Sequence, residues 1–245
     1  MKNAFYYIYS MNAQPLKELR HGLLHLFYPR LCEGCNKPLL ASEKVLCISC
    51  ALHLPETGYH HIADNETALR FAGRIPFAHA TSLAYFTSDG LLQHLLHGLK
   101  YMGKKEIGHY LGMRMALSLA NSDWISSVDM IIPVPLHKAK KAKRGYNQSM
   151  LIAEGMSDIL HIPASDNILE RLRDTESQTR KTRTERVNNM QDAFRVKGKG
   201  RLVNKHVLLC DDVLTTGATL EACALGLLQE ESIKISIVTI GIAIS

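Results

Sequence analysis

The sequence predicts an α/β protein in which helices flank a parallel sheet, preceded by a small segment that is rich in cysteine. In the C-terminal two thirds of the chain, short apolar runs of strand type alternate with segments of helical periodicity. Near the start, two CxxC pairs lie before residue 55, where the composition changes. We therefore expect an N-terminal segment over 1–55, with the cysteines at about 31–52, and an α/β domain over 70–245.

The composition restricts the class of protein. Of the 245 residues, 46% are hydrophobic and 21% are charged, a balance that excludes wholesale disorder. The formal net charge of +6 favours an anionic partner, either a phosphorylated small molecule or a nucleic acid. No stretch reaches the roughly 20 continuous apolar residues that cross a bilayer, and the first residues lack a signal-peptide pattern. We therefore expect no membrane insertion and a cytoplasmic location.

Periodicity and capping residues mark the elements of the expected domain. Asp89–Met102 has apolar residues at helical spacing, with Asp89 as candidate N-cap and Gly103 as the stop. Lys105–Ala120 predicts a second helix, although two glycines interrupt it. Val128–Val134 is a strand-type run that prolines end. The later elements are a helix over Gln148–Leu160, a strand over Val207–Cys210, a helix over Ala218–Gln229 and a strand over Ile235–Ile244.

Ligands of such sheets bind at the carboxyl ends of the strands, so we expect the chemistry just after Val134 and just after Cys210. After Cys210, two carboxylates, Asp211 and Asp212, precede a turn that opens a helix. A helix N-terminus has free N–H groups and a positive dipole end, which suit a phosphate monoester. A glycine lets the backbone approach the anion, and threonine hydroxyls donate further hydrogen bonds. The residues of this turn are Thr215, Thr216, Gly217, Ala218 and Thr219.

The two carboxylates have a different role from the turn, because like charges repel a phosphate. They suit a neighbouring diol, from which they accept hydrogen bonds, with Mg²⁺ nearby. An N-capped helix that simply follows a strand is the alternative interpretation. The arrangement resembles the motif with which type I phosphoribosyltransferases bind phosphoribosyl pyrophosphate (PRPP). That resemblance implies the fold of those enzymes, Asp211 and Asp212 as the catalytic pair that faces the ribose, and a 5′-phosphate wrapped by Thr215–Thr219.

A basic turn follows the strand over Val128–Val134. Within Ile131–Glu154 the order is again strand, turn and helix, and the turn is rich in lysine. A diphosphate leaving group needs cations and backbone N–H groups. We therefore predict pyrophosphate contacts at Lys138, Arg144 and Gly145. A solvated basic loop and contacts with a nucleic-acid backbone are the alternatives.

The order of several segments resembles the ComF family, phosphoribosyltransferase-like proteins associated with DNA uptake in competent bacteria. The basic turn is mostly lysine where relatives tend towards arginine, which puts bidentate phosphate contacts there in question. The resemblance implies PRPP with Mg²⁺ as ligands, and single-stranded DNA and DNA-uptake or recombination proteins as partners. The segments that carry it are CEGC with CISC, LAYFTSDGLLQHLLHGLKYMG (Leu83–Gly103), PVPLH with RGYNQ, Gln178 with Arg186–Asn188 and Phe194, and CDDVLTTGAT.

The four N-terminal cysteines have the spacing of a metal site. Cys32 with Cys35 and Cys47 with Cys50 form two CxxC pairs that can supply four thiolates to a tetrahedral structural Zn²⁺. A segment this short cannot bury much core, so metal binding would largely drive its folding. Redox-active or incidental thiols are the alternative. The ComF resemblance also implies a zinc ribbon at this position.

The segment Arg171–Arg186 is polar and rich in arginine. In type I phosphoribosyltransferases a flexible loop closes over PRPP and excludes water. This segment lies between the two expected phosphate turns, so it could be that lid, a nucleic-acid contact or an exposed linker.

Two functions stay open on the sequence. The first is an enzyme that transfers a ribosyl phosphate from PRPP to an acceptor that the sequence does not identify. The second is a non-catalytic accessory protein that handles single-stranded DNA in transformation and uses PRPP as a regulatory ligand.

Overall fold

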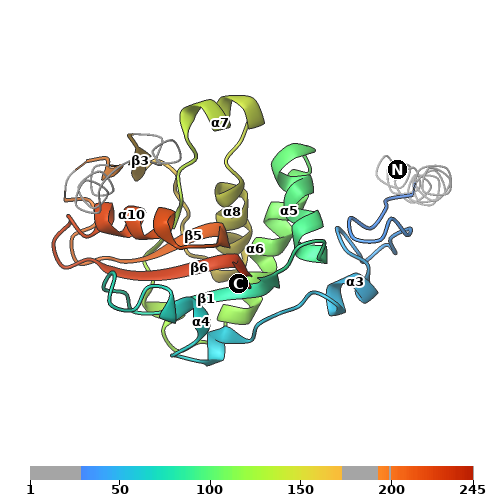
Figure 1. Ribbon diagram of the computed structural model, residues 1–245, viewed down its shortest axis with the longest axis horizontal. Coiled ribbons are helices and arrows are strands. Elements are labelled where there is room, and N and C mark those ends of the chain that lie inside the picture. Colours follow the sequence, from blue (N-terminus) through green and yellow to red (C-terminus); the bar gives the residue numbers. More distant parts are fainter. Residues whose placement is uncertain (1–28, 173–192, 199, 245) are drawn as a thin grey trace, which may run out of the picture. The chain divides into compact units, whose positions relative to one another are not determined.

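The structure is a computed structural model that describes residues 29–172, 193–198 and 200–244 (Figure 1). The chain divides into two units, Met1–His53 and Leu54–Ser245. The described part of the first unit contains the four cysteines and a short helix, α3 (Ile48–Leu52). The second unit contains the sheet and the longer helices.

A four-stranded sheet forms the centre of the second unit, in the order β1-β6-β5-β2. Every neighbouring pair in it is parallel. The two central strands, β5 and β6, are buried along almost their whole length, because both faces of the sheet are covered. The strands are β1 (Ala80–Phe86), β2 (Met130–Pro133), β5 (His206–Leu214) and β6 (Lys234–Ala243).

Helices lie on both faces of this sheet (Figure 1). One face carries α5 (Leu91–Tyr101), α6 (Lys105–Leu119) and α8 (Gln148–Leu160). The other carries α10 (Ala218–Leu227), which shares a hydrophobic core with the small antiparallel sheet of β3 (Leu169–Arg171) and β4 (Phe194–Val196). The shorter elements are α4 (Glu66–Leu69), α7 (Lys138–Arg144) and the 3₁₀ turns η1 (Tyr59–His61) and η2 (Ile125–Ser127).

Two glycines bring α6 and α8 into backbone contact. A Cβ at Gly112 would lie 2.0 Å from the carbonyl oxygen of Ile152, and one at Gly155 would lie 2.1 Å from that of His109. Neither distance is compatible with a side chain. The glycine at 112, which weakens the helical pattern in the sequence, therefore allows the close approach of the helices behind the sheet.

The structure confirms the predicted class, a parallel sheet flanked by helices with a cysteine cluster near the N-terminus. Helix α8 has the predicted bounds, and α6 ends one residue earlier than predicted. Strand β1 was not predicted. The predicted N-cap at Asp89 is wrong, because this residue has φ +61° and Gly90 caps α5 instead. Strand β5 continues past Cys210, the predicted end, to Leu214.

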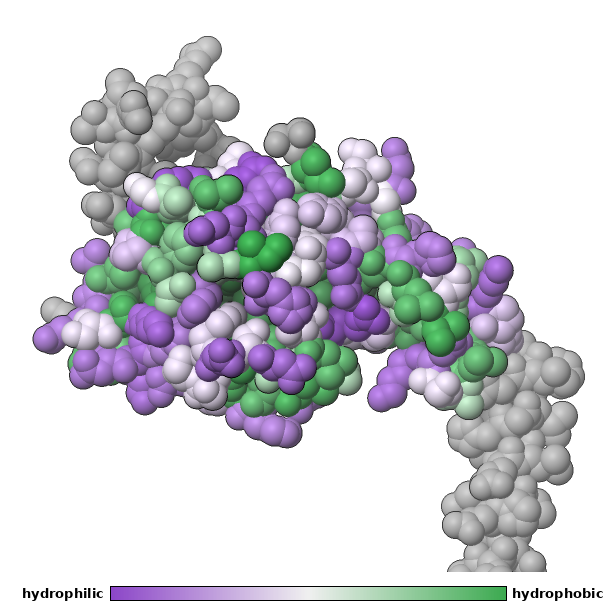
Figure 2. Space-filling model, turned by 90° about the horizontal axis from the view of Figure 1, so that it is seen from below, coloured by the Kyte–Doolittle hydropathy of each residue, from purple (hydrophilic) through white to green (hydrophobic). Residues whose placement is uncertain are grey.

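Figure 2 shows a face on which hydrophilic and hydrophobic residues are interspersed. Within the described residues, no helix has both the length and the apolar character needed to cross a bilayer.

Candidate functional site

Strand β5 carries both acidic residues inside the sheet. Asp211 pairs in register with Thr239 of β6, and the strand ends three residues after Asp211. Asp211 is 9% exposed and Asp212 is 6% exposed. The sequence pattern predicts these acids just after a strand that ends at Cys210, but they lie buried within β5, because the strand is longer than its apolar run.

Each carboxylate has a partner from a different helix. The hydroxyl of Ser149, in the first turn of α8, donates a hydrogen bond of 2.8 Å to Oδ1 of Asp211. The same oxygen accepts the backbone N–H of Asp212 at 2.9 Å. The ammonium of Lys100, in the last turn of α5, lies 2.7 Å from Oδ2 of Asp212. No local pattern in the sequence indicates that Lys100 or Ser149 would reach these acids.

Burial and mutual repulsion dominate the electrostatics of the pair. Burial raises the pKa of Asp211 to about 7, and the neighbouring charge of Asp212 acts in the same direction. Hydrogen bonds from Ser149 and the Asp212 N–H, together with the charge of Lys100, partly offset this rise. The folded protein thus disfavours the ionised form of Asp211, and the surrounding structure keeps the two carboxyl groups together.

The threonine turn follows β5 directly and leads into α10. Gly217 caps the helix with φ +80°, and a Cβ there would lie 3.1 Å from Cε1 of Phe71. A side chain at this position would therefore be strained and crowded. Thr215, Thr216 and Ala218 are exposed, so the start of α10 opens to solvent. A helix start of this kind, with free N–H groups and exposed hydroxyls, can bind a phosphate.

Two arginines hold the outer side of this turn, and the sequence analysis missed both. Nη1 of Arg74 donates to the carbonyl of Thr216 at 3.0 Å, and Nη1 of Arg70 donates to the carbonyl of Thr215 at 3.4 Å. Arg74 also forms an ion pair with Glu221 of α10. Because these side chains approach from a segment about 145 residues earlier in the chain, no local pattern could have indicated them.

The predicted basic turn after β2 forms a short helix, α7, which Gly145 ends with φ +82°. Lys138 is exposed at its start. Arg144 is directed inwards: its guanidinium lies over the ring of Tyr101 at 5.6 Å and donates to the side chain of Gln148. The pyrophosphate contacts predicted at Lys138, Arg144 and Gly145 stay a prediction. The segment 173–192, which includes most of the predicted lid, lies outside the described residues.

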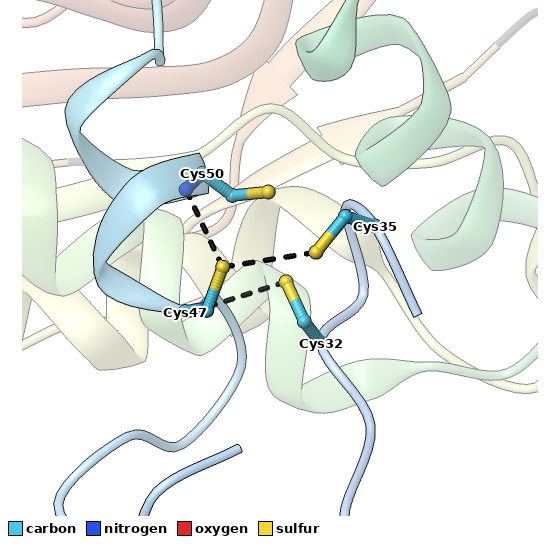
Figure 3. A group of neighbouring side chains, drawn as sticks. All are labelled: Cys32, Cys35, Cys47 and Cys50. Atoms are coloured by element: carbon cyan, nitrogen blue, oxygen red, sulfur yellow. Dashed lines mark hydrogen bonds between the residues drawn. The ribbon is translucent and has the colours of Figure 1, made fainter. Parts of the chain in front are cut away.

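In the first unit, the four cysteine side chains converge (Figure 3). Their sulfur atoms all lie within 4.8 Å of one another, and the Sγ atoms of Cys35 and Cys47 are 3.7 Å apart. Four Zn–S bonds of about 2.3 Å in a tetrahedron would place the sulfur atoms about 3.8 Å apart. The cluster therefore has the size and ligand type of a structural zinc site.

Backbone N–H groups favour the thiolate form of Cys32, whereas burial raises the pKa of Cys50. The N–H of Cys47 donates to Sγ of Cys32 at 3.2 Å and the N–H of Gly34 to the same sulfur at 3.4 Å, while the N–H of Cys50 donates to Sγ of Cys47 at 3.5 Å. Burial raises the pKa of Cys32, but these N–H groups outweigh it and lower the pKa to about 7. Such donors stabilise thiolates that bind a metal.

A separate hollow of about 280 Å³ lies beside the start of β1, between η1 and Trp124. The rings of His79 and Trp124 stack there, 4.5 Å apart. Since β1 starts where the neighbouring parallel strands start, the hollow lies at the amino ends, opposite the acid pair. It is not part of the site at the end of β5.

We compared the chain with curated proteins, with protein-family models and with solved structures. The first of these comparisons finds relatives that match most of the chain. The chain is 39% identical over 205 residues to "Competence protein F" of Haemophilus influenzae, covering 81% of this chain and 84% of that protein. It is 26% identical to "DNA utilization protein YhgH" of Escherichia coli K12, covering 84% and 88%. It is also 26% identical to "Competence protein ComFC" of Bacillus subtilis, covering 82% and 79%.

The other two comparisons contribute little. No protein-family model matches the chain. A solved hypothetical protein of Neisseria gonorrhoeae with bound ppGpp aligns with a TM-score of 0.38 and 18% identity, over 57% of this chain and 69% of that one. That likeness is too weak to support an argument.

Proposed function

This chain belongs to the ComF family, and from that premise we propose that it binds PRPP with Mg²⁺ at the end of β5 and acts in the handling of incoming DNA. The observation that carries the proposal is the continuous segment of two carboxylates, an exposed threonine turn and a helix start. The link to DNA rests on the relatives, which are named competence and DNA utilization proteins.

The chemistry of the ligand fits the parts of the site. The start of α10 would hold the 5′-phosphate through its N–H groups and the threonine hydroxyls. Asp211 and Asp212 would accept hydrogen bonds from the two ribose hydroxyls. In a phosphoribosyl transfer the bond from C1 to pyrophosphate breaks with oxocarbenium-like character on the ribose, so the protein contributes positioning and charge. Mg²⁺ would neutralise the departing pyrophosphate, and Lys138 and Arg144 are the proposed cations beside it.

The experiment that tests this proposal is a calorimetric titration with PRPP and Mg²⁺. Replacing Asp211 and Asp212 together by alanine removes charge-assisted hydrogen bonds of roughly 1.5–3 kcal/mol each, so affinity should fall at least about a hundredfold. The control is Glu154→Ala with Asp158→Ala, which removes two exposed negative charges from α8 and should leave affinity unchanged. If the wild type shows no binding, or the acid-pair variant binds as tightly as the wild type, the proposal is wrong.

The second candidate function is binding of single-stranded DNA without catalysis. The relatives named for DNA utilization favour it, together with the lysines exposed on α7. Binding should be tolerant of sequence and should weaken steeply as salt rises, because phosphate contacts release counterions. Lys138→Ala with Lys143→Ala should reduce the salt dependence, whereas Lys205→Ala with Lys234→Ala, at the amino ends of the strands, should not. Binding that does not respond to salt, or no binding at low salt, contradicts this function.

A screen for release of pyrophosphate from PRPP separates the two candidates. Release that depends on one of a panel of amine, base and nucleic-acid acceptors supports an enzyme, while tight PRPP binding without release supports a regulatory ligand.

We also propose that the cysteine cluster holds one structural Zn²⁺ through Cys32, Cys35, Cys47 and Cys50. The convergence of the sulfur atoms supports this, as does the N–H group pattern around them. Elemental analysis of protein purified without added metal should give one zinc per chain.

A further inference from the structure

The acid pair of β5 has an internal cation that the proposed function does not yet use. The ammonium of Lys100 lies 2.7 Å from Oδ2 of Asp212, with the two side chains 24% and 8% exposed. A shielded ion pair of this kind differs from a surface salt bridge, because water screens it less. Its position on the candidate ligand-binding carboxylate raises the question of what the lysine does there.

We propose that Lys100 is a positioning residue of the PRPP site, which offsets the negative charge of the acid pair and orients the carboxylate of Asp212 to accept a hydrogen bond from the ligand's diol. This inference rests on the proposed function. It assigns to α5 a role in the site that neither the threonine turn nor the basic helix α7 supplies.

Simple electrostatics explains why such a cation is needed. PRPP carries several negative charges, and two adjacent buried carboxylates would repel both each other and the ligand. A positive charge within the protein offsets one of the two carboxylates without occupying every acceptor site, since a carboxylate can accept several hydrogen bonds. The raised pKa of Asp211, which follows from burial and then from Asp212, is consistent with a pair that is short of positive charge.

The contacts around the acids show which groups share this task. Lys100 of α5 faces Asp212, and Ser149 of α8 donates to Asp211. Cys210 of β5 and Cys223 of α10 are fully buried thiols beside the pair whose pKa burial raises, and the charge of Arg171 acts on Cys223. The ion pair of Lys100 with Asp212 joins a cation directly to the acid pair.

The last turn of α5 is also fixed from the segment that carries the predicted pyrophosphate contacts. The hydroxyl of Tyr146 donates to the carbonyl of Leu99, one residue before Lys100. The guanidinium of Arg144 lies over the ring of Tyr101, one residue after it. The backbone before Lys100 and the side chain after it thereby contact the segment from Arg144 to Tyr146 that joins α7 to α8. Lys100 thus connects the acid pair with the basic helix, the two halves of the proposed ligand site.

Titration of PRPP with Mg²⁺ into a set of variants tests the inference. Lys100→Met should weaken binding about tenfold or more, since it leaves a buried carboxylate without its counter-charge. Lys100→Arg, which keeps the charge, should restore affinity to within about threefold of the wild type. The control is Lys205→Met, because Lys205 forms an ion pair with Asp129, 2.9 Å away and more exposed, at the opposite end of β5. That control should bind as the wild type does.

A double-mutant cycle separates positioning from a direct contact with the ligand. If Lys100 acts through Asp212, the double variant with Lys100→Met and Asp212→Asn should bind PRPP no more weakly than the single variant that has the lower affinity. Effects that multiply, or a Lys100→Met variant that binds as tightly as the wild type, overturn the inference while the proposed function stands. Absence of PRPP binding by the wild type refutes the proposed function, and the inference with it. Should Lys100→Met fail to fold, as judged by circular dichroism, Lys100→Gln takes its place in the cycle.

Discussion

The cysteine cluster and the acid pair both bring together groups that carry negative charge when they lose their protons, but they differ in where the opposite charge comes from. Four cysteine sulfurs converge within 4.8 Å of one another, and backbone N–H groups donate hydrogen bonds to the sulfurs of Cys32 and Cys47. The two aspartates lie in a sheet with Lys100 already 2.7 Å from one of them. The first group is therefore suited to a metal ion, and the second to a neutral or anionic ligand that a metal accompanies.

The structural support of the two groups differs as well. Helix α3, beside the cysteines, has no buried residue, whereas β5 is buried over nearly its whole length. The described part of the first unit buries only a few aliphatic side chains, Leu39, Val45 and Leu46, and a segment with so small a core depends on its metal for folding. A strand inside a sheet can hold strained charges because the surrounding core supplies the stability. We conclude that loss of the counter-charge should unfold the first unit and only weaken ligand binding in the second.

The largest effect that we predict is the loss of the folded cysteine segment in Cys47→Ser. Removing one of four thiolates should abolish tight zinc binding, and structural zinc contributes on the order of 10 kcal/mol to such segments. Hydrogen exchange measured by mass spectrometry should show full exchange over 30–53. The same measurement should show unchanged protection in β5 and β6.

Cys223→Ser is the reciprocal control for that variant. Cys223 is fully buried in α10, so a hydroxyl there should destabilise the sheet unit and leave the zinc content at one per chain. A cysteine segment that stays folded without metal would contradict the proposed zinc site and, with it, the contrast between the two groups.

The next effect is the loss of folding stability that comes from burying the acid pair in its ionised form. The pKa of Asp211 is raised from 3.8 to about 7, so ionising this group opposes folding. The native protein then binds more protons than the unfolded chain between these values, and stability should fall as the pH rises from about 4 to about 7. Asp211→Asn removes the cost and should stabilise the protein at pH 8, on the order of 3 kcal/mol, with little change at pH 4.

Urea denaturation at several pH values measures this effect, and Asp129→Asn provides a control of opposite sign. A hydrogen bond from Lys205 and then the N–H of His206 lower the pKa of Asp129, so its charged form favours folding. Asp129→Asn should therefore lose stability at neutral pH, and lose less in acid. If Asp211→Asn shows no gain in stability at pH 8, the hydrogen bonds to Asp211 and the charge of Lys100 already compensate the ionisation of Asp211 in the folded protein.

The same two regions show what the sequence could and could not predict. Ligand spacing located the cysteine cluster, and periodicity located α8 and most of α6. Strand β1 escaped notice because it contains Thr81 and Ser82, polar residues that are buried. The hydroxyl of Ser82 lies 2.7 Å from those of both Thr67 and Thr239, and this network between distant segments compensates the polarity.

The partners of the acid pair were beyond sequence reasoning for a similar reason. Lys100 and Ser149 belong to helices that precede β5 by many residues, and each is one polar residue among several on its helix. Arg70 and Arg74 reach the threonine turn from equally far away. A local motif indicates which groups meet a ligand, whereas the groups that hold the motif in place come from tertiary packing.

The smallest effect that we predict follows from the way the threonine turn spreads its contacts. In the cysteine cluster each side chain would be one of four ligands of the proposed zinc, so a change of one atom at Cys47 should abolish the site. In the turn, the N–H groups at the start of α10 would carry much of the phosphate binding, and Thr219→Val removes one hydroxyl from a nearly isosteric side chain. Affinity for PRPP should then fall by at most about tenfold, the value of one neutral hydrogen bond. Gly217→Ala should have a larger effect, because φ is +80° there and the added Cβ would crowd Phe71 and displace the N–H groups themselves. Calorimetry on both variants checks this order. A Thr219→Val variant weaker than Gly217→Ala would mean that the side chains of the turn, and not its backbone, hold the phosphate, and the turn would then resemble the cysteine cluster in its sensitivity to single side chains.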